Sequence, residues 1–379
     1  MSDTLLPTGC YDVLPPFARL ESQLDQQLLN HFESYGYEQV SPPLFEYTDS
    51  LLAGRGRILS PQVVRVMDPH NQKVMGIRAD MTLQIGRIAL SRMENAPRPL
   101  RLCYSGQILR LEADVTARRQ MQQTGIELIG AKSLDGDIEV MLVTLRSLQS
   151  IGVGHITLDL NLPAFIGAIL SESPLDDNEL STVFRSLAHK DSTRLKQFNE
   201  PACDLLCDLM LASGDATDAI EKVSKANVPD SVANHIEDLR YVIQGLEKRK
   251  GDNVDITLDV TERGGLDYYT GISFTCFATE QNMELGRGGR YTIDRNQTRE
   301  SAIGSTLYTE RLKRLMPKPP TPSRVYVAEG FSERDITALH DQGYVTILAL
   351  PGADDHDIGS TARAFACEYI YQSGSLEKI

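Results

Sequence analysis

The chain has 379 residues, of which 41% are hydrophobic and 24% are charged, the balance of a soluble globular protein with room for one large core or for two to three ordinary domains. No apolar run approaches the ~18 residues that a membrane-spanning helix needs, and the first residues lack the basic start and cleavage site of a secretory signal, so we expect a cytoplasmic protein without a membrane partner. The formal net charge of −14 disfavours nucleic acid as the main partner, because phosphate backbones are neutralised by clustered Lys and Arg.

The first predicted element is an amphipathic helix that ends near Gly36. Residues 37–46 resemble a strand, but Pro42-Pro43 interrupts it and predicts a sheet edge or a boundary. The helix is predicted from apolar residues that recur every four positions, namely Leu20, Leu24, Leu28 and Phe32.

A hairpin follows this strand. Residues 63–68 and 73–78 flank the turn sequence Pro69-His70-Asn71, which predicts two antiparallel strands. Thr82 is then predicted to cap a short helix that runs to Ala89.

The middle of the chain predicts further strands and one helix. Residues 101–108 and 125–129 are expected to pair around a polar, basic loop at 111–123. Residues 137–148 are expected to be helical, and 155–162 alternate cleanly as a strand.

From about residue 173 to 249 the composition shifts to Asp, Glu and Lys with Leu at helical spacing, which predicts an all-helical insertion. Strands are expected to return at 254–260 and 272–277. The insertion is therefore expected to interrupt a sheet rather than to follow it.

The C-terminal part begins after a proline-rich segment, 317–322, which predicts a stiff linker. Beyond it, residues 324–328, a helix capped by Ser332 and residues 344–350 predict a β-α-β unit. A last helix is expected around 360–371. The predicted organisation is a core at 1–316, the linker, and a small α/β unit at 323–379.

The six cysteines are scattered and predict no metal site. Cys203 and Cys207 are the close pair, and their spacing places them on one face of a helix and matches no zinc pattern. We expect free thiols in a reducing compartment, and no metal or other cofactor.

Short motifs occur in a fixed order along the chain, each weak alone. Together they resemble the class II synthetase core of histidyl-tRNA synthetases over about residues 7–316. The resemblance implies an α+β fold with an antiparallel sheet flanked by helices, and a dimer interface at the first motif. The motifs are 36–43 with Glu46, 78–82, 106–112 with Arg118, Gln120 and 123–127, then 261–271, 288–291, and Glu310-Arg311.

The resemblance implies a histidine pocket whose chemistry is sensible for these residue types. Asp80 would pair with the ligand ammonium, and Thr82 and Gln123 would complete its hydrogen bonds. Glu127 and Tyr269 would hold the imidazole, since leaving such buried polar groups unpaired with a wrong ligand costs ~1–3 kcal/mol each. Walls would come from Tyr268 and Tyr291, and the histidine carboxylate would need a cation, for which Arg263 and Arg118 are the candidates.

Structural interpretations of the same residues stay open. Glu127 on a strand is also consistent with an ordinary ion pair to Arg118. Tyr268 and Tyr269 are also consistent with core aromatics, and Asp80 with a carboxylate placed at a positive helix N-terminus.

The pattern departs from the synthetase family on the ATP side. The family has an arginine directly before Gly-Leu-Asp, where this chain has Gly264, and a glycine supplies no charged fork to an oxyanion. Ala113 and Met121 replace an arginine and a nucleotide-stacking aromatic, and Tyr308 replaces a glycine. Losing several such groups is severe for phosphoryl chemistry, so we expect histidine recognition without adenylation. Three charged residues of the site persist but are explicable as structural ion pairs, namely Arg110, Glu112 and Arg311.

The chain is therefore similar to the family of ATP phosphoribosyltransferase regulatory subunits. This resemblance implies a non-catalytic, allosteric subunit that activates a short-form catalytic subunit and confers feedback inhibition by L-histidine in histidine biosynthesis. Only 57 residues follow Pro322, too few for the anticodon-binding domain expected of an active synthetase. The alternatives are a divergent, active histidyl-tRNA synthetase and a stand-alone histidine-binding sensor.

Overall fold

The computed structural model describes residues 6–111, 117–171, 173–262, 269–295, 298–317, 320–350 and 357–379. The chain divides into two compact units, Met1–Pro317 and Lys318–Ile379, which are described separately below. Among the helices of the described residues, none is both long and apolar enough to cross a membrane.

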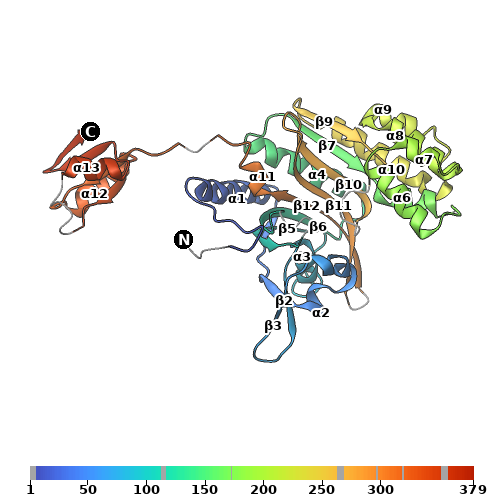
Figure 1. Ribbon diagram of the computed structural model, residues 1–379, viewed down its shortest axis with the longest axis horizontal. Coiled ribbons are helices and arrows are strands. Elements are labelled where there is room, and N and C mark those ends of the chain that lie inside the picture. The colour runs from blue at the N-terminus through green and yellow to red at the C-terminus, as the bar shows by residue number, and fades with distance from the viewer. Residues whose placement is uncertain are drawn as a thin grey trace. The chain divides into compact units, whose positions relative to one another are not determined.

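The larger unit is organised around one mixed, mostly antiparallel sheet (Figure 1). Two neighbouring pairs are parallel, β1 with β5 and β7 with β9. In spatial order, the nine strands found in the described residues are β1 (Glu38–Gln39), β5 (Leu100–Leu109), β6 (Gln120–Ile129), β12 (Thr298–Tyr308), β11 (Met283–Arg295), β10 (Tyr269–Ala278), β7 (Ile156–Asn161), β9 (Val254–Leu258) and β8 (Gly214–Asp215).

Strand alternation gives this sheet two different faces. Helices α1 (Phe17–Ser34) and α4 (Leu134–Ser150) pack on one face, against side chains such as Ile126 and Leu128 of β6. Helix α3 (Thr82–Ala89) packs on the other face, in a second cluster that contains Tyr104 and Tyr291. Because successive residues of a strand point to opposite faces, Glu127 lies on the α3 side.

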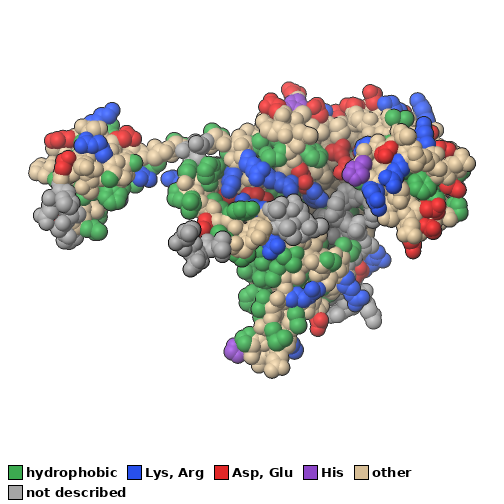
Figure 2. Space-filling model, in the orientation of Figure 1, with side chains coloured by type: hydrophobic (Ala, Val, Ile, Leu, Met, Phe, Trp, Pro, Cys, Tyr) green, Lys and Arg blue, Asp and Glu red, His purple; other side chains and the backbone are tan. Residues whose placement is uncertain are grey.

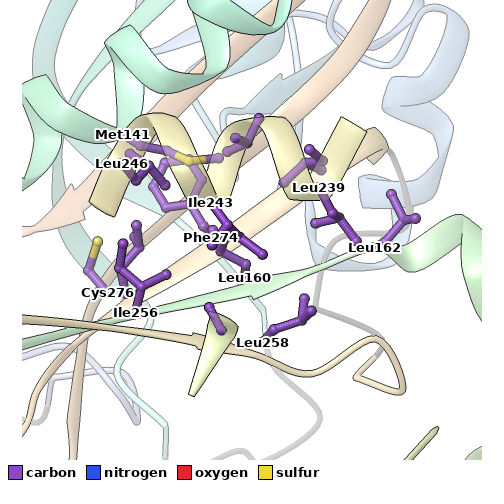
Figure 3. Close-up of a cluster of buried hydrophobic side chains, with 14 of the residues drawn as sticks. Met141, Leu160, Leu162, Leu239, Ile243, Leu246, Ile256, Leu258, Phe274 and Cys276 are labelled. Atoms are coloured by element: carbon purple, nitrogen blue, oxygen red, sulfur yellow. The ribbon is translucent and has the colours of Figure 1, made fainter. Parts of the chain in front are cut away.

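The helical insertion packs against the far half of the sheet. Figure 3 shows side chains of α10, among them Leu239, Ile243 and Leu246, over Leu160 of β7 and Phe274 of β10. The prediction of helices through 173–249 is confirmed except at β8, a two-residue strand that pairs with β9. Helix α5 (Pro163–Leu170) precedes this region, whose helices in the described residues are α6 (Asp177–Ala188), α7 (Ser192–Lys196), α8 (Pro201–Ala212), α9 (Ala216–Val223) and α10 (Asp230–Glu247).

The predicted hairpin is confirmed and belongs to a three-stranded sheet in the order β2-β4-β3. The edge prediction for 37–46 is also confirmed, because Pro42-Pro43 separates β1 at the edge of the large sheet from β2 in the small one. The elements here are β2 (Phe45–Tyr47), α2 (Thr48–Leu51), the 3-10 helix Gly54–Gln62, β3 (Arg65–Met67) and β4 (Val74–Ile77).

Two boundary predictions are wrong. Thr82 does not cap α3; it is the first helical residue, Met81 holds the cap position, and the backbone N–H of Thr82 donates to Asp80 Oδ1 at 2.8 Å. The predicted loop at 111–123 is also too long, because β6 begins at Gln120, where it pairs with Leu109.

The smaller unit confirms the β-α-β prediction, with Ser332 capping α12 through a reciprocal pair of hydrogen bonds with Asp335. The expected last helix at 360–371 is wrong in its second half. Helix α13 ends at Ala364, and Ser373 and Gly374, both at positive φ, turn the chain into a terminal hairpin. The four-stranded sheet has the order β14-β13-β15-β16, and the elements are β13 (Arg324–Val327), α12 (Glu333–Asp341), β14 (Val345–Leu348), α13 (Ile358–Ala364), β15 (Tyr369–Gln372) and β16 (Ser375–Lys378).

Candidate amino-acid site

A narrow cavity of about 10 Å³, room for about one water molecule, lies on the α3 face of the large sheet. Its floor is shaped by glycines, because Glu127 of β6 pairs with Gly304 of β12, which pairs with Gly289 of β11. A Cβ atom on Gly304 would lie 1.8 Å from Glu127 Oε2, and one on Gly289 would lie 2.8 Å from a ring carbon of Tyr269. The absence of side chains at these two positions therefore keeps the site open.

Glu127 is the most deeply buried acid of this cavity, with 1% of its surface exposed. Tyr291 donates a hydrogen bond to its Oε2 at 2.7 Å, and Tyr104 donates to its Oε1 at 3.4 Å. Burial raises the pKa of Glu127 to about 8, although hydrogen bonds from Tyr291 and Thr82 partly oppose the shift. A buried carboxyl with three hydroxyl partners suits a ligand that can donate a proton or carry positive charge.

The alternative ion pair between Glu127 and Arg118 does not occur in the part of the chain that the structure describes. Arg118 instead donates from Nε to the backbone oxygen of Gln120 at 2.8 Å. Arg118 also lies near Glu310. Burial raises the pKa of Glu310, and the positive charge of Arg118 partly opposes that shift. Arg118 is thus placed toward α11 (Thr309–Leu312), and it does not line the cavity.

Asp80 lies at the start of α3 and is 3% exposed. Its Oδ2 accepts from Gln123 Nε2 at 3.1 Å and lies 3.4 Å from Arg110 Nη2. Gln123 also accepts from the backbone N–H of Met81 at 3.1 Å. Gln123 therefore fixes Asp80 and the helix start together, and the helix-terminus interpretation of Asp80 is confirmed by its contact with the backbone N–H of Thr82.

The aromatic wall contains two of the predicted tyrosines. Tyr269 is half-buried and pairs in register with Tyr291, whose ring is 2% exposed and packs in the α3 cluster. Both line the cavity together with Asp80, Thr82 and Glu127. Arg263 and Tyr268 lie outside the described residues.

Sequence reasoning missed several residues of this site, among them Tyr104, Thr306 and Arg287. Tyr104 reaches Glu127 from β5, and Tyr104 Oη and Thr306 Oγ1 are 2.8 Å apart. Arg287 lines the cavity from β11. The signal was strand alternation, since residues 287, 289 and 291 share one face once Tyr291 is assigned to the pocket.

On the expected ATP side, the charged groups bind other protein groups. Arg110 donates to the backbone oxygen of Ala79 from Nε at 3.1 Å, and Arg311 forms an ion pair with Glu284 at 2.7 Å. The guanidinium of Arg311 lies 4.7 Å from the ring centre of Tyr308, which is 4% exposed and also lines the cavity. Two predicted structural ion pairs are therefore confirmed, Arg110 with Asp80 and Arg311 with Glu284. Glu112 and Ala113 lie outside the described residues.

Met121, at the position where the family stacks an aromatic on adenine, packs among buried side chains of the α3 cluster. It is 9% exposed. The face that would present a stacking ring is therefore occupied by a core methionine.

The chain is similar to known proteins over most of its length. A family model described as histidyl-tRNA synthetase matches residues 9–312. The chain is 38% identical over 380 residues to an ATP phosphoribosyltransferase regulatory subunit from Rhodospirillum centenum, covering 100% of this chain and 97% of that protein. It is also 38% identical over 355 residues to a regulatory subunit of the same name from Paramagnetospirillum magneticum, covering 93% of each.

A solved structure from Bacillus halodurans, described as an ATP phosphoribosyltransferase regulatory subunit/histidyl-tRNA synthetase, superposes with a TM-score of 0.80 at 20% identity. The match covers 96% of this chain and 97% of that one, and it shows the class II synthetase-like α+β fold. The chain belongs to the family of ATP phosphoribosyltransferase regulatory subunits, built on the fold of histidyl-tRNA synthetases.

Proposed function

We propose that the chain is a non-catalytic subunit that activates a short-form ATP phosphoribosyltransferase and transmits feedback inhibition by L-histidine in the first step of histidine biosynthesis. The observation that carries this proposal is the buried, glycine-floored cavity with Asp80 and Glu127, in a chain whose relatives bear the name of that regulatory subunit. Histidine would be the effector, and the catalytic subunit the partner.

The cavity suits histidine because its polar groups match both ends of the ligand. Asp80 offers a carboxylate oxygen for the ammonium, beside the amide of Gln123. Glu127, with Tyr291 and Tyr269 beside it, offers a proton acceptor or donor for the ring. An apolar ligand of the same size would leave these buried groups unpaired, at ~1–3 kcal/mol each.

Loss of adenylation is part of the proposal. Tyr308 is buried against Arg311 where the synthetase family has a glycine, and Arg311 is already paired with Glu284. An arginine that must stabilise phosphoryl charge needs free donors aimed at the nucleotide. The rival, an active synthetase, predicts histidine-dependent exchange of pyrophosphate into ATP.

Self-association through the first motif completes the proposal. The three-stranded sheet and the segment before it expose large apolar side chains, and Figure 2 shows hydrophobic side chains over β2 and β3. Such a cluster on a surface is typical of a protein interface. The exposed apolar side chains are Leu44, Phe45, Tyr47, Val66, Met67 and Val74.

The test is the rate of phosphoribosyl-ATP formation by the short catalytic subunit, measured with and without this chain across a histidine titration. We expect the chain to raise the rate and histidine to suppress that increase. No change in rate with a folded chain would contradict the regulatory role and favour the stand-alone sensor. Histidine-dependent pyrophosphate exchange by this chain alone would favour the synthetase.

A further inference from the structure

Among the described residues, the proposed function names no partner for the α-carboxylate of histidine, and Arg263 lies outside them. Position 264, where the synthetase family has an arginine, is glycine. Arg118 donates to the backbone of Gln120 and does not line the cavity. Among the described residues that line the cavity, the cationic side chain is that of Arg287.

Arg287 lies at a distance from Glu127 that fits the length of a histidine whose imidazole ring contacts Glu127. It pairs with Thr306 of β12, and Gly289, two residues along β11, pairs with Gly304 beside Glu127. Two residues of a strand span about 6.8 Å, which matches the reach of histidine from its ring to its carboxylate. A ring held at Glu127 therefore places the carboxylate at the level of Arg287.

The charge balance around Arg287 favours an anion. Glu284 Oε1 accepts from Arg287 Nε at 2.7 Å, and Glu284 Oε2 lies 2.7 Å from Arg311 Nη1. Two guanidinium groups thus share one carboxylate, which leaves one positive charge in excess. Within the described residues, Nη1 of Arg287 has no hydrogen-bond partner, while Nε and Nη2 both contact Glu284.

The guanidinium also stays charged. Burial lowers the pKa of Arg287, but Tyr308 and the carboxylate of Glu284 outweigh it, so the pKa lies above its ordinary value. A permanently charged, planar donor already oriented by Glu284 is suited to a carboxylate.

We propose that Arg287 binds the α-carboxylate of the histidine in this cavity, in place of the arginine that the synthetase family has at position 264. This assignment rests on the proposed function. Asp80 and Arg287 then bind opposite charges of the zwitterion, and Glu127 binds the ring.

The experiment compares L-histidine with histidinol, in which a CH₂OH group replaces the carboxylate, by isothermal titration calorimetry on the full chain. A charge-assisted hydrogen bond predicts that the wild type prefers histidine by roughly 10–100-fold. In Arg287→Gln we expect that preference to fall to within about 3-fold, while the affinity for histidinol is retained. A thermal melt of each variant checks that the fold persists.

Two matched variants serve as controls. Arg311→Gln removes the other guanidinium on Glu284 without changing a residue that lines the cavity, and Arg118→Gln removes the alternative cation. Arg118→Gln should keep the preference for histidine in full. Arg311→Gln should keep a smaller preference, because the excess positive charge is lost while the donors of Arg287 remain. A preference that survives in Arg287→Gln, or that collapses in Arg118→Gln, would overturn the assignment.

The two ligands distinguish a wrong role for Arg287 from the absence of a histidine site. A wild-type chain that binds neither ligand contradicts the histidine effector site itself, and the assignment of Arg287 fails with it. A wild-type chain that prefers histidine, together with Arg287→Gln losing equal affinity for both ligands, contradicts only the carboxylate contact and makes Arg287 a structural residue.

Discussion

Two arginines of strand β11, Arg287 and Arg290, are three residues apart and face opposite sides of the sheet. Arg290 points to the α4 side, where its guanidinium contacts Asp137, the backbone oxygen of Ala131 at 2.7 Å and Ser301 Oγ at 2.6 Å. Arg287 points to the cavity side, where it shares Glu284 with a second arginine. The first guanidinium is fully used in holding the fold together, whereas the second keeps a donor available for a ligand.

The two carboxylates explain the difference. Asp137 is fully buried, and burial raises its pKa even though Arg290 opposes the shift. Glu284 remains 18% exposed, and although burial raises its pKa, Arg287 and Arg311 lower it overall. Residue type and motif position alone would have selected Arg290, which lies inside Gly-Gly-Arg-Tyr, as the functional arginine. The hydrogen bonds indicate Arg287 as the functional arginine instead, because, among the described residues, the guanidinium of Arg290 is fully paired and that of Arg287 is not.

The largest expected effect comes from breaking the structural pair. Arg290→Ala leaves Asp137 buried without its cation, and breaking a buried pair costs ~3–5 kcal/mol. Urea unfolding should show this loss in the free energy of unfolding. Arg299→Ala is the matched control, since the Arg299 side chain is 68% exposed and its pair with Asp294 is superficial; it should cost under about 1 kcal/mol. Equal losses in both variants would contradict the anchor role of Arg290.

The glycine floor gives the next prediction. Gly304→Ala places a Cβ where Glu127 Oε2 now lies, so the carboxyl must move and the ring contact is lost. We expect histidine affinity to fall roughly 10–100-fold, the equivalent of ~1–3 kcal/mol of overpacking. Calorimetric titration measures it, with Gly154→Ala as the control, because a Cβ there meets nothing within 4 Å. Unchanged affinity in Gly304→Ala would mean that Glu127 does not contact the ligand.

A pH titration tests the buried carboxyl itself. The pKa of Glu127 rises from 4.5 to about 8 on folding, so its neutral form is the one that the fold favours. The neutral Glu127 carboxyl contributes its full stabilisation of the fold below pH 4.5. This stabilisation is lost as the pH rises from 4.5 through about 8, at about 1.4 kcal/mol per pH unit. The Glu127→Gln variant has a side chain of the same shape that does not ionise, so its free energy of unfolding should not fall with pH at this position.

The measurement is urea unfolding of the wild type and Glu127→Gln without ligand at several pH values. The stability of the variant relative to the wild type should grow between pH 5 and pH 8. A difference that is independent of pH would show that Glu127 is already ionised in the folded state.

Much of the fold follows from local pattern, and the errors have local causes. The edge at Pro42-Pro43, the hairpin at 63–78 and the capping of α12 by Ser332 rest on residues whose chemistry acts on their own backbone. The last helix was wrong because residues 369–372 pair with a strand that follows them, and helical spacing cannot report such pairing.

Site residues that belong to a sequence motif could be predicted, whereas residues that reach the site only through the pairing register of the strands could not. Asp80, Glu127 and Tyr291 stand in motifs and line one cavity. Arg287 precedes its motif, and Tyr104 reaches Glu127 only because β5 and β6 pair in the observed register. The spatial order β6-β12-β11 joins residues almost 180 positions apart, and no local signal encodes it.

The smallest expected effect concerns the shared carboxylate. Arg287→Gln leaves Glu284 paired with Arg311, and Arg311→Gln leaves it paired with Arg287. With both arginines partly exposed, each single change should alter the free energy of unfolding by under about 1 kcal/mol. The double variant leaves Glu284 without either cation, so its loss should exceed the sum of the two single losses. Urea unfolding of the four proteins measures this coupling. Simple additivity would mean that the arginines do not substitute for each other on Glu284, and the excess positive charge assigned to the cavity wall would then be wrong.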